Sequence, residues 1–412
     1  MNLITASGLP AADEIEAEIV ERKGAGHPDT LADGLAEEIS RVYSRYCLDQ
    51  FGVILHHNTD KTALLGGAAE VRFGYGALTA PIVALVNGRL TPQLGAHRIP
   101  VRDIVESATS GFLSRSLPLL EPTTDLVVRP RLSQASSPGA VTGPTGEQTA
   151  GRRFWFAPRD LDDLAERHGL FANDTSAGVA YAPLSTVERL ALDGERHLTS
   201  EAFRAAHPNY GTDIKLMVVR DRRDVHVTAC VPQIAVHTPN IDAYVAARME
   251  AARLIDDLAR KSAPEFRIRV AVNTRDHDDR RELYLTAIGS ALESGDEGVV
   301  GRGNRANGLI SMLRPMSMEG VSEKNPVYHV GKLYNLAAQR AADRLNALTG
   351  RSYVVALVSQ SGRDLHDPWQ AFVHASGDAP VDPLLVRKAL TEAMRSLDEI
   401  RAALLADELV TA

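Results

Sequence analysis

The chain has 412 residues, of which 44 % are hydrophobic and 24 % charged, so it can build a sizeable core and is neither a disordered nor a fibrous protein. Its formal net charge of -8, without a block of basic residues, argues against nucleic acid as a partner. Two cysteines, no signal peptide and no apolar run long enough for a bilayer predict a cytoplasmic protein that does not contact membranes.

The predicted elements alternate irregularly along the chain. A helix is predicted from Pro28 to about Gln50, because apolar residues recur there at three- and four-residue steps and Gly52 suits its end. Strands are predicted at 53–57, 62–66, 70–73, 81–86, 125–132, 213–219, 224–231, 266–272, 282–288, 352–359 and 371–375. Further helices are predicted at 101–115, 160–167, 185–192, 239–261 with Thr238 as its cap, 327–348 closed by Gly350, and 382–405.

The order of these elements predicts the fold class. Strands arrive in pairs and helices singly, so strict βαβ alternation fails. This favours an α+β fold with antiparallel or mixed sheets, each covered by helices on one face. The unit of a strand pair plus a helix recurs about three times, which suggests three similar subdomains.

A polar segment interrupts the pattern at 133–151. It is rich in glycine, proline, serine and threonine, and therefore predicts a surface loop. Phe154, Trp155 and Phe156 follow it directly. They fit either a strand that anchors the loop to the core or part of a lid, 133–159, that closes over a ligand.

Familiar nucleotide and hydrolase motifs are missing from the sequence. It contains no GxxxxGK[ST], no GxGxxG between a strand and a helix, no GxSxG and no HExxH. Instead, polar blocks dense in charge, glycine and asparagine stand beside apolar strands. These blocks cover 21–34, 54–67, 171–185, 211–220 and, as the fifth, 295–308 followed by 314–335.

The first and last blocks favour binding of a polyphosphate with a divalent metal. In the first, His27 and Asp29 flank a proline that opens a helix, and a helix N-terminus attracts anions. An N-capped turn with a surface histidine is the alternative interpretation. In the last, acids stand beside Arg302 and Arg305 among five glycines, a combination that suits phosphate and metal together.

Two further patterns bear on this prediction. Only seven of the 45 basic residues are lysines, and five of these lie in or beside the polar blocks, where a compact positive charge would hold phosphate. In contrast, His56 and His57 are adjacent in a predicted strand and so point to opposite faces, which disfavours a shared metal site.

Seven motifs in one order resemble the archaeal-type S-adenosylmethionine synthetases. They are VERKGAGHPDT with LADG, ILHHNTD, ANDTS with GVAYAPLS, DIKLM, GDEG with VGRGNRANGLI, RPMSME and KNPVYHVGKLYN. The likeness runs from about residue 18 to 405. It implies one compact unit of three interleaved α+β subdomains with pseudo-threefold symmetry, and a homodimer with active sites at the subunit interface.

The resemblance also implies the reaction. The sulfur of methionine would displace the whole triphosphate from C5′ of ATP, and the triphosphate would then be hydrolysed, with Mg2+ required and K+ as a possible activator. His27 would stabilise the leaving oxygen. Metal ligands would be Asp29 and Asp296, and the phosphate clamps would be Lys215, Arg302 and Lys324. Contacts to ATP or the acceptor are expected from Asp60, Gln134, Ser136, Asp160, Asp174 and Arg305.

The sequence departs from the family pattern in its gating loop and in smaller changes at Lys61, at Tyr75 in FGYG, where the family favours a glycine run, and at Glu323. The gating loop of type GQGSxD is replaced by SQASSPG, and an insertion of some twenty residues precedes the next candidate acid, Asp160. Lys61 stands where the family usually has glutamine, and Glu323 where it has glycine. Beside Lys324, Glu323 would either pair with the lysine or disfavour a bound polyphosphate.

These departures leave two alternatives to a methionine adenosyltransferase. One is a related enzyme that releases triphosphate from ATP with another acceptor or by elimination. The other is a non-catalytic nucleotide-binding subunit, against which the retained polar residues weigh.

Overall fold

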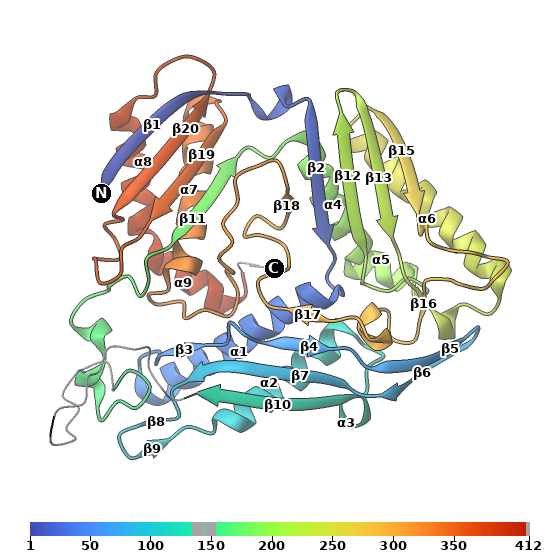
Figure 1. Ribbon diagram of the computed structural model, residues 1–412, viewed down its shortest axis with the longest axis horizontal. Coiled ribbons are helices and arrows are strands. Elements are labelled where there is room, and N and C mark those ends of the chain that lie inside the picture. The colour runs from blue at the N-terminus through green and yellow to red at the C-terminus, as the bar shows by residue number, and fades with distance from the viewer. Residues whose placement is uncertain (134–143, 145–153, 409–412) are drawn as a thin grey trace.

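The computed structural model describes residues 1–133, 144 and 154–408. Three main sheets, each covered by helices, surround the segment that joins β17 (Gly298–Val299) to α7 (Val330–Thr349) (Figure 1). Each sheet contributes to its own cluster of buried apolar side chains. The sheets contain both parallel and antiparallel pairs, so the predicted mixed α+β class is confirmed.

The first sheet has the strand order β10-β7-β4-β17, with β3 also paired to β7. Its strands are β3 (His57–Asn58), β4 (Ala63–Leu65), β7 (Ile82–Leu90), β10 (Leu126–Ser133) and β17. The covering helices are α1 (Pro28–Phe51), α2 (Val101–Ser116) and the short α3 (Pro122–Asp125). The predicted apolar stripe of α1 is buried here, and Gly52 ends the helix with a left-handed φ of 72°.

The second sheet has the order β15-β13-β12-β2-β18. Its strands are β2 (Ala17–Lys23), β12 (Lys215–Asp221), β13 (Asp224–Cys230), β15 (Arg267–Val272) and β18 (Ile310–Ser311). It is covered by α4 (Thr186–Thr199), α5 (Glu201–Ala206) and α6 (Ile241–Ser262). Strand β2 leads directly into α1, so this sheet and the first are joined at residues 24–27.

The third sheet has the order β1-β20-β19-β11. Its strands are β1 (Asn2–Leu9), β11 (Ala177–Ala182), β19 (Tyr353–Val358) and β20 (Gln370–Ser376), and α7, α8 (Pro383–Arg395) and α9 (Leu397–Ala406) cover it. Since β1 pairs with β20, the first and the last strand of the described chain lie side by side in one sheet.

Smaller elements complete the described chain. Two-stranded ribbons are formed by β5 (Ala68–Arg72) with β6 (Tyr75–Ala80), β8 (Gln93–Leu94) with β9 (His97–Arg98), and β14 (Gln233–Ile234) with β16 (Leu285–Thr286). The 3-10 helices are η1 (Ala12–Glu14), η3 (Leu161–Asp163), η4 (Ala165–Arg167), η5 (Ala235–His237) and η6 (Ala291–Ser294). Within residues 1–133 and 154–408, no helix has the length and apolar character that crossing a bilayer requires.

Several predicted boundaries need correction. Helix α6 begins at Ile241 under Asn240, which accepts a hydrogen bond from the Ala243 N–H, so Thr238 is not the cap. The predicted strand 282–288 is reduced to β16, and 53–57 to the two residues of β3. The single predicted helix 382–405 is two helices, because the backbone leaves the helical conformation at Ser396. Strand β1 was not predicted.

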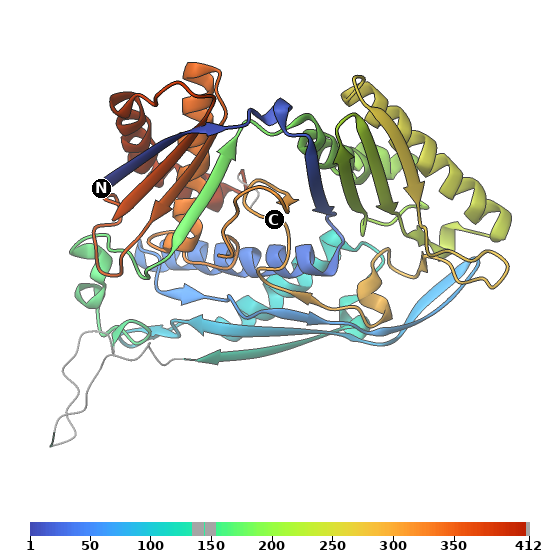
Figure 2. The ribbon, with the colours of Figure 1, turned by 45° about the horizontal axis from the view of Figure 1, so that its top comes forward.

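The centre of the molecule is occupied by the segment 295–329. Figures 1 and 2 show it between the three sheets, above α1 and the first sheet. It contains β17, which pairs with β4, and β18, which pairs with β2. The richest polar block of the sequence therefore lies where the sheets converge.

Candidate active site

The start of α1 holds two of the predicted residues. Pro28 is the first helical residue, and His27 is the N-cap, whose Nδ1 accepts a hydrogen bond from the Asp29 N–H at 3.1 Å. Gly24 and Gly26 allow the turn before it to approach the residues that precede β12, since their N–H groups donate to the Ile214 and Thr212 carbonyls. Because Nδ1 is an acceptor, the other ring nitrogen of a neutral His27 carries the proton.

Asp29 is held on both carboxylate oxygens. Oδ2 accepts from Lys23 Nζ at 2.8 Å and Oδ1 from the Val299 N–H at 3.0 Å. Burial opposes ionisation of this carboxyl, but these two hydrogen bonds outweigh it and hold its pKa below the usual range. Asp29 is therefore a carboxylate at neutral pH.

Positive charge gathers around this helix start. Lys215 opens β12 opposite Lys23 of β2, and its Nζ lies 3.1 Å from Glu21 Oε1. Burial, followed by the charge of Lys23, lowers the pKa of His27 to about 4. The negative charge of Asp296 acts in the other direction and favours a higher pKa of His27. Asp296 is exposed, and it lies near enough to the imidazole to influence it. His27, Asp29, Lys215 and Asp296 thus form one electrostatic cluster.

The loop after β17 is shaped by a buried acid on α1. Asp33 accepts hydrogen bonds from the Gly301 and Gly303 N–H groups at 2.7 and 3.1 Å. A Cβ on Gly303 would lie 2.1 Å from Asp33 Oδ2, so a larger residue there would displace the Asp33 carboxylate from its hydrogen bonds. Burial raises the pKa of Asp33 to about 6. Next to this loop, Lys23 Nζ donates to the Arg302 carbonyl at 2.6 Å, which connects the loop to the helix start.

A cleft of about 700 Å³ opens beside the cluster. Its walls come from strands of the first sheet, the segment 300–329 and residues 155–174. Four predicted residues line it, namely Asp60, Asp174, Arg302 and Lys324. This volume lies within the range of about 300 to 1,000 Å³ that is usual for small-molecule sites.

The two cations of the cleft differ in their surroundings. Arg302 is exposed, and its guanidinium forms no hydrogen bond or ion pair with the described residues. Lys324 is buried, with Nζ 3.2 Å from Glu319 and 3.1 Å from Glu323. Burial opposes its charge, but the two carboxylates outweigh burial and raise its pKa. Arg302 is thus free for a ligand, and Lys324 is a pre-positioned charge.

Glu323 has both an unfavourable backbone conformation and an unfavourably buried carboxyl group. Its φ is 70°, in the left-handed region that favours glycine, the residue usual at this position in the resembled family. Its side chain is 1 % exposed, and Oε2 has no hydrogen-bond partner in the described part of the chain. Burial raises its pKa to about 8 against the attraction of Lys324. Of the two outcomes expected for Glu323, pairing with Lys324 is the one observed.

Replacing Glu323 should therefore stabilise the protein, more so at higher pH. The folded-state pKa of about 8 lies above the ordinary value of 4.5, so stability contributed by this group is full below about pH 4.5 and is lost as the pH rises through 8. Glu323→Gln removes this loss, and Glu323→Gly also relieves the left-handed backbone, worth about 1 kcal/mol. Urea unfolding at about pH 6 and pH 9 measures both. Equal pH dependence in Glu323→Gln and the parent would contradict the buried charge.

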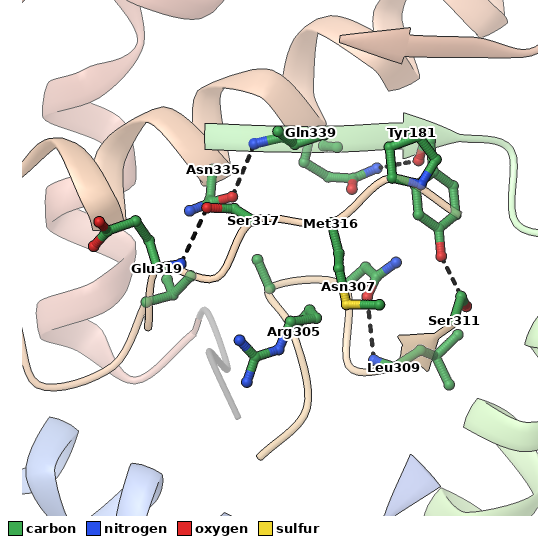
Figure 3. Close-up of a pocket in the computed structure, with 15 residues that line it drawn as sticks. Tyr181, Arg305, Asn307, Leu309, Ser311, Met316, Ser317, Glu319, Asn335 and Gln339 are labelled. Carbon is green, nitrogen blue, oxygen red and sulfur yellow. Dashed lines mark hydrogen bonds between the residues drawn. The ribbon is translucent and has the colours of Figure 1, made fainter. Parts of the chain in front are cut away.

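The remaining predicted residues lie elsewhere. Arg305 donates to the Gly301 and Gly303 carbonyls at 2.7 Å each, and it lines a pocket of only about 20 Å³ with Glu319, Asn335 and Gln339 (Figure 3). Such a pocket is too small for a substrate, so Arg305 braces the loop. Asp160 caps η3 through the Asp162 N–H. Gln134 and Ser136 lie outside the described residues.

The two adjacent histidines have different surroundings, although only His57 lies in a strand. His57 is buried and bonded to Ser40 Oγ and the Leu55 carbonyl, and burial lowers its pKa to about 3. His56 faces a different pocket beside Tyr328. The structure thus does not combine them into one metal site. Among the described residues, no three His, Cys, Asp or Glu side chains are grouped as ligands for one metal ion.

Lys23 is the main residue that the sequence analysis missed. Its ammonium joins Asp29, the Arg302 carbonyl and, at 3.9 Å, Glu21. The scarcity of lysines was a signal that could have identified it. Other cleft residues had no role assigned from the sequence. The polar blocks and family motifs contain Asn58, Asn173, Glu319 and His329, whereas Arg89 lies outside them and carries no such signal.

The comparisons with known proteins agree on one family. The sequence model described as S-adenosylmethionine synthetase (AdoMet synthetase) matches residues 3–140 and 154–407. S-adenosylmethionine synthases of Pyrobaculum neutrophilum and Aeropyrum pernix are each 40 % identical, over 85 % and 87 % of this chain and 84 % and 85 % of theirs. That of Haloarcula marismortui is 39 % identical over 88 % of this chain and 86 % of its own.

A solved structure shows the same fold at low identity. An unusual S-adenosylmethionine synthetase from Campylobacter jejuni has a TM-score of 0.54 with 14 % identity, and the match covers 97 % of this chain and 95 % of that one. The chain belongs to the S-adenosylmethionine synthetase family. The resemblance inferred from the seven motifs, and the methionine adenosyltransferase class with it, is confirmed.

Proposed function

We propose that this chain forms S-adenosylmethionine by displacement of triphosphate from C5′ of ATP by the methionine sulfur, followed by hydrolysis of the triphosphate. Family membership supports the activity. The observation that carries the residue assignment is the convergence of His27, Asp29, Lys215 and Asp296 beside a cleft lined by Arg302 and Lys324.

The displacement needs alignment and charge neutralisation more than proton transfer. A thioether sulfur has no proton to lose, so no general base is required. The leaving triphosphate gains charge at its bridging oxygen, and preorganised donors at that position lower the barrier. The cluster at the start of α1 and the cations of the cleft provide such donors.

We assign the phosphate contacts to Arg302, Lys324 and Lys215. Arg302 is free in the cleft and its planar guanidinium suits a phosphate edge. Lys324 is positioned by Glu319, and Lys215 by Glu21. The protonated ring nitrogen of His27 donates to the leaving 5′ oxygen. Asp60 and Asp174, on the cleft wall, contact the rest of ATP or the acceptor.

The donor set also fits Mg2+. Asp29 is ionised and Asp296 is an exposed carboxylate near His27, and Mg2+ is commonly held by one or two carboxylates together with substrate phosphates. Asp29 and Asp296 would hold the ion, with Lys23 keeping Asp29 in place. When bound, Mg2+ neutralises phosphate charge. A K+ activator remains an expectation without an assigned residue.

The larger arrangement is part of the same proposal. Three sheets with three apolar clusters fit three interleaved subdomains of one compact unit, related by pseudo-threefold symmetry. A homodimer with interfacial active sites and a cytoplasmic location also stay proposals. The proposed lid, 133–159, falls largely outside the described residues, and the family match omits 141–153 within it.

A product assay tests this function. Pure protein incubated with ATP, Mg2+ and methionine should yield S-adenosylmethionine with phosphate and pyrophosphate, identified by mass spectrometry. Omitting methionine is the control and should leave ATP unchanged. Triphosphate release without methionine would indicate elimination. An adenosine derivative of another acceptor would indicate that a different nucleophile takes the place of methionine. Unchanged ATP in every reaction would point to a non-catalytic subunit.

A further inference from the structure

A second cavity lies behind the cleft and contains an unsatisfied carboxylate. Its volume is about 270 Å³, and its lining includes His56, Trp155, Glu166, Phe171 and Tyr328. Since drug-sized ligands usually occupy about 300 Å³ or more, this cavity suits a smaller molecule. None of these residues has a role in the proposed displacement.

Glu166 on η4 is the only acid of this lining. Both of its carboxylate oxygens are buried, and neither has a hydrogen-bond partner in the described part of the chain. Buried polar groups in folded proteins nearly always have partners, and an unpaired carboxylate is costly. A missing donor, supplied by a ligand, accounts for this arrangement.

His56 is fixed beside this acid but does not satisfy it. Tyr328 lies 2.6 Å from His56 Nδ1, and Trp155 stacks on the imidazole with a centroid separation of 5.2 Å. His56 is only 3 % exposed, and its Nε2 lies 3.5 Å from Glu166 Oε1. This nitrogen is buried and forms no hydrogen bond with the described residues. The cavity thus presents a carboxylate and aromatic rings on one wall.

This combination is selective for positive charge. A carboxylate accepts hydrogen bonds from an ammonium group, and aromatic faces attract cations in desolvated sites. We propose that the cavity binds the ammonium group of a small organic ligand, with Glu166 as its acceptor. A neutral donor could hydrogen-bond to the carboxylate but would leave its charge uncompensated, and an anionic group would be repelled.

The cavity shares a wall with the cleft. Trp155, Asn173 and Tyr328 line both spaces, so a ligand bound by its ammonium group lies next to the site assigned to ATP. Two sources of the ammonium group follow. One is the amino group of the acceptor methionine, which rests on the proposed function, and the other is a separate small amine.

Glu166→Gln tests the proposal, because it removes the charge and keeps the shape. The matched control is Asp162→Asn, which makes the same charge change on an exposed side chain four residues away. The intact protein is titrated calorimetrically, without ATP, with methionine, with propylammonium and with uncharged propan-1-ol. The affinity for methionine or propylammonium should fall at least about tenfold in Glu166→Gln only, as for loss of a hydrogen bond to a charged group.

The outcomes separate the ligands and the two proposals. If Glu166→Gln loses affinity for methionine, the ligand of the cavity is the acceptor methionine, and the KM for methionine should rise while the KM for ATP stays the same. If it loses affinity for propylammonium alone, the ligand is a separate small amine. Unfolding should occur at the same or a higher temperature in Glu166→Gln, since no native hydrogen bond is removed. Equal binding to parent and variant, no binding to either, or a clear loss of stability overturns the proposal. The product assay decides the proposed function independently.

Discussion

Alanine at Arg302 should lower the turnover of S-adenosylmethionine formation by at least about a hundredfold and leave the fold intact. Losing one preorganised donor to a developing oxyanion costs about 2.7 to 4 kcal/mol of barrier. The fold should tolerate the change, because Arg302 contacts the described residues by hydrogen bonds of its backbone alone, its N–H donating to Val299 and its carbonyl accepting from Lys23. Steady-state kinetics and thermal unfolding of the same preparation measure the two effects.

The control for this variant is Arg387→Ala, which removes an exposed arginine on α8. It should change neither quantity. A folded Arg302→Ala protein with parental turnover would remove Arg302 from the phosphate clamp, whatever the product assay shows.

Lys324→Ala should lower both the turnover and the stability of the protein. A second substitution at Glu323 should restore the stability without restoring the turnover. Above pH 8, Glu323 is an ionised buried carboxylate, and Lys324 is its nearest countercharge at 3.1 Å. Removing one partner of a buried ion pair costs up to about 3 to 5 kcal/mol. The loss should be largest near pH 9 and smaller near pH 6, where Glu323 carries a proton.

Glu323→Gln should restore the stability of Lys324→Ala but not its turnover. The amide removes the buried charge, whereas the phosphate contact of Lys324 stays absent. Denaturant unfolding and kinetics of the two single variants and the double variant form the cycle. If the double variant recovers turnover, Lys324 acts by neutralising Glu323 and not by holding phosphate.

Much of the fold was predictable from local sequence pattern. Helix α1 was predicted to within a residue of its observed end, because its apolar period, its proline and the following glycine all act within a few residues. The end of the chain was predicted less well, since Ser396 carries no strong break signal between α8 and α9. Strand β1 was missed because its pairing partner, β20, is more than 360 residues away.

The seven motifs were sufficient for the family and hence for the enzyme class, since their residue types and order are local properties of the chain. They also named the acids and cations of the candidate site. They could not show which of these are already occupied by other side chains. Arg305 braces a loop, whereas the guanidinium of Arg302 lines the cleft without a partner among the described residues, although the two lie only three positions apart in one motif.

Sequence alone determined the chemistry available to this protein: scarce lysines, paired acids and glycines in polar blocks, and a glutamate in place of glycine at position 323. Only the tertiary structure decided how that chemistry is arranged. Asp29 meets Lys23 and Val299, and the carboxylate oxygens of Glu166 are buried without a donor in the described part of the chain, because elements distant in the chain pack together there. Burial and charge at a point depend on all the elements that surround it, and local sequence describes only one of them.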